Sequence, residues 1–202
     1  MKKLMMIAAM MVATLSANAQ GVEVGQFYLK PMVGATMSTL TKIDDKKMKF
    51  GLVGGAEVGV KVAEPFDVTA GVLVAMQGTK VKDSDQYKDV SSTLTYLNVP
   101  IMANVYVLPG LALKAGVQPG FLLSSKSKFS ENVYDVWEKR ENTSKDGLNK
   151  FDLSIPMGIS YEFSNFIIDA RYNLGLTRVT KDPSPSSKNS VIMLTLGYKI
   201  PF

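Results

Sequence analysis

The chain of 202 residues contains no cysteine and no histidine. Without cysteine it cannot form disulfides, thiolate zinc sites or a cysteine nucleophile. Without histidine it lacks the common imidazole metal ligand and the usual base of a catalytic triad. These absences exclude most familiar active sites, so we expect a protein that is not an enzyme and that needs no cofactor and no metal. The composition, 46% hydrophobic and 20% charged, is nonetheless typical of a folded chain.

Long hydrophobic runs are also scarce, and the clearest one lies near the N-terminus. Lys2 and Lys3 precede an apolar segment at residues 4–15, and Ala17-Asn18-Ala19 supplies the small residues of a cleavage site. The segment is too short for a transmembrane helix, which needs about 20 apolar residues, and it fits a secretory signal peptide. We therefore predict a cleaved signal peptide at residues 1–19 and one domain at residues 20–202. For an exported chain with a net charge of +5, no nucleic-acid partner is expected.

Alternation of apolar and polar residues dominates the rest of the chain. The alternating runs are residues 26–38, 50–62, 68–79, 93–107, 111–123, 151–163, 166–177 and 190–202. A tilted strand of about 9–11 residues crosses a bilayer, so these runs are long enough to span one. The connections alternate between short ones, at 63–67, 108–110 and 164–165, and long polar ones, at 39–49, 80–92, 124–150 and 178–189. This arrangement predicts an all-β fold, an eight-stranded antiparallel up-and-down transmembrane β-barrel.

Charged residues within the predicted strands lie on the side that carries glycine and small polar residues. Glu57 and Lys61, for example, share a side with Gly59. Small side chains suit the crowded lumen of an eight-stranded barrel, so we expect this side to face inward and the aliphatic side to face lipid. The predicted lumenal charge network is Lys30, Glu57, Lys61, Lys114, Asp152, Glu162, Asp169, Arg171 and Lys199.

A soluble lipocalin-like barrel with an apolar lumen is the alternative, because alternation alone does not show which side is inside. Two features favour the membrane. The side opposite the charges is almost unbroken aliphatic, as in Ile192, Leu194 and Leu196. Aromatic residues also gather beside the short connections, as in an interfacial girdle; they are Phe27, Phe66, Tyr161, Phe163, Phe166, Tyr198 and Phe202.

Four segments resemble the PorT-like outer-membrane β-barrel family of Bacteroidota. They are residues 96–101 (YLNVPI), 118–123 (QPGFLL), 169–177 (DARYNLGLT) and 196–200 (LGYKI). The resemblance implies an outer-membrane location and insertion by the barrel-assembly machinery, which would read an assembly signal at Tyr198, Ile200 and Phe202. An ordinary lipid-facing strand end is the other interpretation of these three residues.

The same resemblance bears on function, because named members of the family assist type IX protein secretion. It implies a small integral protein with a structural or adaptor role in the cell envelope. The expected partners are outer-membrane lipid, lipopolysaccharide and components of a secretion system.

The lumenal charges leave three interpretations open. Their five bases and four acids nearly balance, and burying unpaired charge is costly, which favours a paired plug that closes the barrel. A narrow channel or solute path with a charged lumen is the alternative function. Acid–base catalysis by a pair of these carboxylates is the third and least supported interpretation.

Three groups of residues in the predicted loops are further candidates. The groups are Lys46, Lys47 and Lys49; Asp83, Asp85 and Asp89; and Tyr134, Val136 and Trp137. The lysines can bind lipid phosphates or form a solvated loop, whereas the aspartates lack the glycine and closing glutamate of an EF-hand, so calcium is not expected there. The third group places apolar side chains among charges, where they contact a partner, enter the membrane interface or cap the barrel.

Overall fold

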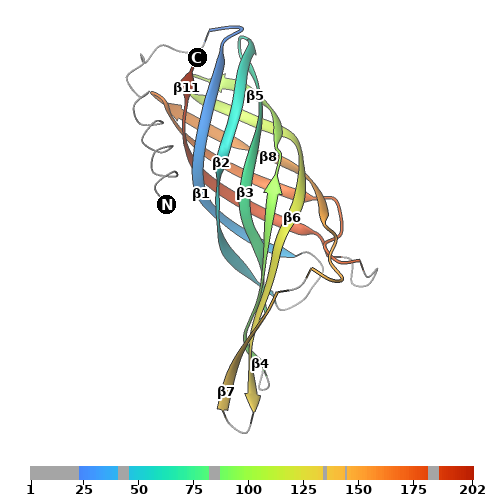
Figure 1. The fold of residues 1–202 in the computed structure, drawn as a ribbon. Coiled ribbons are helices and arrows are strands. Elements are labelled where there is room, and N and C mark those ends of the chain that lie inside the picture. Colours follow the sequence, from blue (N-terminus) through green and yellow to red (C-terminus); the bar gives the residue numbers. More distant parts are fainter. Residues whose placement is uncertain (1–22, 41–45, 82–86, 134–135, 144, 182–186) are drawn as a thin grey trace, which may run out of the picture.

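A computed structural model describes residues 23–40, 46–81, 87–133, 136–143, 145–181 and 187–202 (Figure 1). The predicted signal peptide lies outside these residues. The strands are β1 (Phe27–Leu40), β2 (Lys46–Ala63), β3 (Phe66–Val81), β4 (Tyr87–Asn98), β5 (Ile101–Leu108), β6 (Leu111–Val133), β7 (Val136–Asn142), β8 (Phe151–Phe163), β9 (Phe166–Gly175), β10 (Asn189–Tyr198) and β11 (Ile200–Pro201).

The strands form a closed antiparallel ring, because β3 and β6 pair with both β4 and β5, β6 pairs with β8, the other walls pair in chain order, and β10 and β11 pair with β1. Two walls of the barrel consist of two strands each. Val99 and Pro100 separate β4 from β5, and Lys199 separates β10 from β11. β7 pairs only with β6 and is not part of the ring. Leaving it out and counting each of the two pairs once gives a ring of eight, which confirms the predicted all-β, up-and-down barrel. No helix among the described residues is long and apolar enough to cross a membrane.

Three tight turns join strands at the end of the barrel where the C-terminus lies, and we call it the short-turn end (Figure 1). The turns are Glu64-Pro65, Pro109-Gly110 and Ser164-Asn165. Gly110 has φ = +78°, and a Cβ there would meet the backbone oxygen of Glu162, so the second turn requires glycine. The short connections were predicted, but β3 begins at Phe66, so Asp67 belongs to a strand and not to a turn.

The opposite, long-loop end differs from the prediction. The expected loops at 80–92 and 124–150 are largely strand, because β4 begins at Tyr87, β6 runs to Val133 and β7 pairs with β6. Beyond the barrel, residues 87–92, 124–133 and 136–142 form a projection that we call the β arm (Figure 1). The residues of the arm do not alternate between apolar and polar, so hydrophobic periodicity did not predict its strands. The arm is a sheet because its strands pair through the backbone, with Ser91 opposite Lys128 and Lys128 opposite Glu141.

Outward-facing side chains form an apolar surface around the barrel. Val33, Phe50 and Leu194 are 55–69% exposed, whereas Glu57 and Arg171 are 0–2% exposed. An apolar surface this extensive is suited to lipid rather than water. The aromatic residues predicted at the short-turn end also face outward, and Phe27 stacks on Phe202 with ring centroids 6.4 Å apart.

The lumen is less uniformly polar than the sequence suggested. One buried apolar cluster inside it consists of Met32, Val53, Leu73, Ala75 and Met193. A second contains Leu94, Tyr96, Leu122 and Val179. Side chains of both kinds therefore fill the interior, as expected for a barrel of this size.

The assignment of faces predicts how the barrel tolerates charge. Leu194→Arg should lower the free energy of unfolding by about 2–4 kcal/mol, because it places a cation in hydrocarbon. Thr195→Ser, at the neighbouring buried lumenal position, should cost about 1 kcal/mol or less. Urea unfolding in phospholipid vesicles, followed by the different gel migration of folded and boiled protein, measures both. Equal losses would contradict the assignment.

Candidate functional site in the barrel lumen

Five buried charged side chains meet inside the lumen, and we call them the central network. They are Lys30 from β1, Glu57 from β2, Lys114 from β6, and Asp169 and Arg171 from β9. Each is at most 5% exposed. The network thus joins four strands across the barrel.

Arg171 and Asp169 connect the two sides of the central network. Nη1 of Arg171 donates to Oε1 of Glu57 at 2.6 Å, while its Nε and Nη2 donate to the two oxygens of Asp169 at 2.7 and 2.9 Å. Nζ of Lys30 lies 2.6 Å from Oε2 of Glu57 and 3.7 Å from Oδ2 of Asp169, and Lys114 also pairs with Asp169. Every charge of the network therefore has an opposite charge in direct contact.

The strand register explains why these side chains meet. Lys30 and Glu57 are direct partners in the β1–β2 ladder, and Asp169 and Arg171 are two residues apart and share a face. Glycine provides the room beside them. Gly71 is opposite Glu57, and a Cβ there would collide with the Glu57 side chain.

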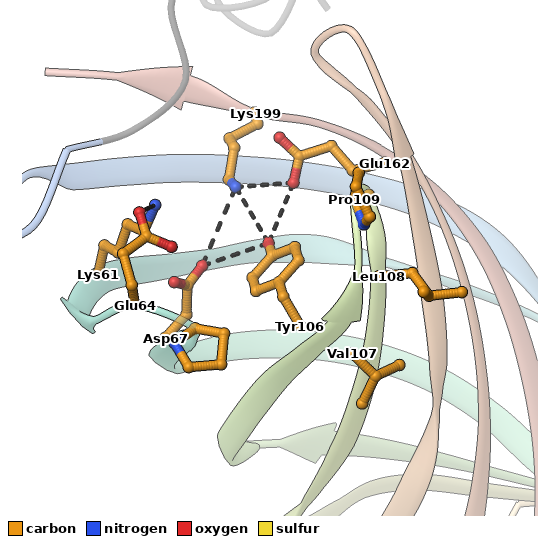
Figure 2. Close-up of a pocket in the computed structure, with 11 residues that line it drawn as sticks. Lys61, Glu64, Asp67, Tyr106, Val107, Leu108, Pro109, Glu162 and Lys199 are labelled. Carbon is orange, nitrogen blue, oxygen red and sulfur yellow. Dashed lines mark hydrogen bonds and ion pairs between the residues drawn. The ribbon is translucent and has the colours of Figure 1, made fainter.

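A second polar group lies near the short-turn end, and we call it the mouth cluster (Figure 2). Nζ of Lys199 is 2.8 Å from Oε2 of Glu162 and 3.9 Å from Oδ2 of Asp67, and it donates to the Tyr106 hydroxyl at 3.2 Å. That hydroxyl is 3.0 Å from Oε2 of Glu162, and Tyr28 donates to Asp67 at 3.0 Å. Lys199 also lies over the Tyr28 ring, 4.5 Å from its centroid.

The mouth cluster borders a hollow of about 520 Å³. Lys61 and Glu64 pair with each other on one side of it, and Val107 and Leu108 point away from the polar groups (Figure 2). The residues that close the hollow on the turn side are Pro65, Pro109 and Gly110. The hollow is therefore a polar recess beside the short turns.

The nine charges predicted to face the lumen separate into distinct groups. Five form the central network, Glu162 and Lys199 belong to the mouth cluster, and Lys61 pairs with Glu64 beside them. Asp152 lies elsewhere, accepting hydrogen bonds from Oγ1 of Thr177 at 2.6 Å and Nδ2 of Asn189 at 3.1 Å.

Asp67 and Tyr106 are lumenal site residues that were not predicted from the sequence. Asp67 was placed in a turn, although it shares its side of β3 with Thr69, which is the signal that could have identified it. Tyr106 likewise shares a side with the buried Asn104. Beginning the strand predicted at residues 68–79 one residue earlier would have included Asp67.

The predicted assembly signal lies at the end of the last wall. Tyr198 packs edge-on against Phe166 with ring centroids 5.1 Å apart, Ile200 pairs with Leu29, and Phe202 is 70% exposed. Between them, the backbone N–H of Lys199 donates to the carbonyl of Asn165 at 2.7 Å. The C-terminal segment is thus tied both to β1 and to the last short turn.

The loop candidates divide between described and undescribed residues. Lys49 was placed in a loop, but it belongs to β2, and its Nζ donates to the carbonyl of Ser92 at 3.1 Å and contacts Thr93. Only the backbone is described for Lys46, Lys47, Asp89, Val136 and Trp137, which lie in β2, β4 and β7. The remaining candidates, Asp83, Asp85 and Tyr134, lie outside the described residues. No group of three or more metal-binding side chains occurs in the described part of the chain.

The central network predicts a large difference between two charge removals. Arg171→Met should lower the free energy of unfolding by about 3–5 kcal/mol, because it removes the three hydrogen bonds that Arg171 donates to the buried carboxylates of Glu57 and Asp169. Lys61→Met should cost about 0–1 kcal/mol, since its partner Glu64 is 73% exposed. Urea unfolding in vesicles measures both values. Losses of equal size would show that the central network stabilises the barrel no more than the exposed Lys61–Glu64 pair does.

Comparison with known proteins agrees with this architecture. The profile of the family described as outer membrane protein beta-barrel domain matches residues 14–181. No curated protein sequence matches the chain.

Solved structures of outer-membrane barrels are similar in fold. Ail of Yersinia pestis, in complex with the heparin analogue sucrose octasulfate, has a TM-score of 0.50 and 19% identity over 88% of this chain and 100% of that one. Neisserial surface protein A has a TM-score of 0.47 and 13% identity, covering 87% and 97%. OprG of Pseudomonas aeruginosa has a TM-score of 0.43 and 13% identity, covering 92% and 99%. Since the family profile spans most of its length, the chain belongs to the outer membrane protein beta-barrel domain family and is an outer-membrane β-barrel protein.

Proposed function

We propose that this protein is a closed outer-membrane barrel with a structural or adaptor role in the cell envelope. Its barrel anchors it in the membrane, and its β arm contacts partners on the outer side. The observation that carries the proposal is the central network, which fills part of the lumen with paired, buried charges.

A closed lumen argues against transport as the main activity. Eight-stranded barrels are just wide enough for side chains to fill them, and here Arg171 and two lysines reach the carboxylates of Glu57 and Asp169 across the interior. A solute that passed this level would have to separate these ion pairs, which is costly in a confined space.

The β arm supplies the contact surface in this proposal. In outer-membrane barrels the short turns face the periplasm and the longer connections face outward, so the arm lies outside the cell. Among the described strands, β7 pairs with β6 alone, which leaves one edge of β7 without a neighbouring strand. Such an edge can add a strand from another protein through backbone hydrogen bonds.

We further infer that the protein is PorT-like and comes from Bacteroidota, and that its partners include components of a secretion system. The segments at residues 96–101 and 169–177 support this assignment. The apolar band would contact outer-membrane lipid and lipopolysaccharide, and the barrel-assembly machinery would read Tyr198, Ile200 and Phe202 during insertion. Residues 1–19 would direct export as a cleaved signal peptide.

A narrow channel is the second candidate function, and the hollow of about 520 Å³ beside the charged lumen favours it. Planar-bilayer recordings separate the two functions. We expect the purified protein to give no conductance above that of the bilayer alone, because the central network closes the lumen. A reproducible conductance that changes in the Glu57→Gln variant would support the channel instead.

Deleting the outer part of the arm tests the adaptor role. Ser127 and Asn142 are direct ladder partners, so an Asn-Gly turn can replace residues 128–141 without changing the barrel. We expect this variant to keep its heat-modifiable gel migration but to lose the proteins that crosslink to a photoreactive residue at position 127 in intact cells.

A photoreactive residue at Leu194 is the matched control, because that position faces lipid within the barrel wall. Its crosslinks should be the same with and without the arm. Unchanged crosslinking at position 127 after the deletion would contradict a role of the arm in partner contact.

A further inference from the structure

We infer that the hollow beside the mouth cluster is a binding site for one singly charged organic cation, a protonated amine or a guanidinium group, that arrives from the periplasm. This inference concerns the end of the barrel opposite the β arm and does not depend on the adaptor role. It follows from the charge of the hollow, from its unpaired acceptors and from the charge of the central network beyond it.

Acids outnumber bases around the hollow. Its lining includes the carboxylates of Glu64, Asp67 and Glu162 and the ammonium groups of Lys61 and Lys199. Lys61 is paired with Glu64, so Lys199 alone faces the other two carboxylates. One negative charge remains, which a ligand with a single positive charge would neutralise.

Unpaired acceptors show what kind of atom the site lacks. Asp67 is 2% exposed, and its Oδ1 accepts no hydrogen bond from any described residue, although its Oδ2 is occupied by Tyr28. Asn104, the direct ladder partner of Asp67, is buried and its Oδ1 is also unpaired. Buried oxygens of this kind normally have a hydrogen-bond donor, and a carboxylate binds a charged donor most strongly.

Aromatic rings near the carboxylates fit the same kind of ligand. Lys199 lies 4.5 Å from the Tyr28 ring centroid and 5.5 Å from that of Tyr106, which shows that a cationic group fits beside these rings. Tyr106 lies between Asp67 and Glu162 in the hollow (Figure 2). A slim side chain ending in an ammonium or guanidinium group would meet carboxylates and ring faces together.

The central network makes the hollow a site rather than a passage. Its three bases exceed its two acids, so its charge repels a cation that moves deeper. Lys114 of this network is the direct ladder partner of Asn104, so the repelling charges begin directly behind the unpaired acceptors. A cation drawn in by the mouth cluster would therefore stop there.

A titration monitored by NMR tests the site on the mature barrel in detergent micelles. The probe is Nα-acetyl-L-arginine amide, and Nα-acetyl-L-citrulline amide is its neutral counterpart of nearly the same shape. We expect the arginine probe to shift the amide signals of Tyr106, Gly110 and Glu162 to saturation, and the citrulline probe to bind about tenfold more weakly or less. Equal binding of the two probes, or no saturable shift with the arginine probe, would overturn the inference.

Variants locate the binding. Glu162→Gln should weaken the arginine probe about tenfold, because it removes one of the two carboxylates that face Lys199. Asp152→Asn, which removes a buried carboxylate outside the hollow, should leave the affinity unchanged. If Glu162→Gln does not fold, Glu64→Gln replaces it, since Glu64 is 73% exposed and its loss frees Lys61 to oppose the ligand. Affinity unaffected by the tested mouth variant would contradict the site.

n-Butylamine, which carries one positive charge, identifies the source of the cation. Tighter binding of the arginine probe than of n-butylamine would support a basic side chain of a periplasmic polypeptide as the ligand. The reverse order would support a free monoamine at the same site. Because both probes bind far from the β arm, a negative result here leaves the outcome of the arm deletion unaffected.

Discussion

The absence of water around the barrel wall is the constraint on which the rest of the structure depends. In hydrocarbon every backbone N–H and C=O group must find a partner within the protein, so the sheet closes, with β10 and β11 pairing with β1. The same solvent places aliphatic side chains outside and turns the charged residues inward. Charges brought together in so narrow a lumen must then neutralise one another, and Arg171, Glu57 and Asp169 do so through direct hydrogen bonds.

The interior is ordered by level rather than filled at random. The central network has an excess of base, the mouth cluster near the short turns has an excess of acid, and apolar side chains such as Met32 and Leu73 pack elsewhere in the lumen. Neighbouring levels of the described interior therefore carry net charges of opposite sign. This arrangement leaves a polar recess at the short-turn end of the barrel.

The β arm shows where the influence of the lipid ends. Beyond the barrel the strands continue through backbone pairing, with Ser130 opposite Lys139, while the apolar outer side is lost. A sheet that is exposed to water on both sides need not alternate, which explains why its residues were predicted to form a loop. The edge of β7 and the length of β6 give this region a defined shape outside the membrane.

The sequence by itself determined the barrel, its eight walls and the side of each strand that faces inward. Successive side chains of a strand point to opposite faces of the sheet, so the apolar positions mark the lipid side and the polar positions mark the lumen. It also indicated which charges share the lumen. Only the tertiary structure decided which of them meet: Lys30 reaches Asp169 and Lys199 reaches Asp67 through closure of the ring and the stagger of its strands, which no local pattern encodes. The contact between Asp67 and Tyr106 likewise depends on the register of the paired strands β3 and β5, in which Asp67 lies opposite Asn104, and no local pattern sets that register.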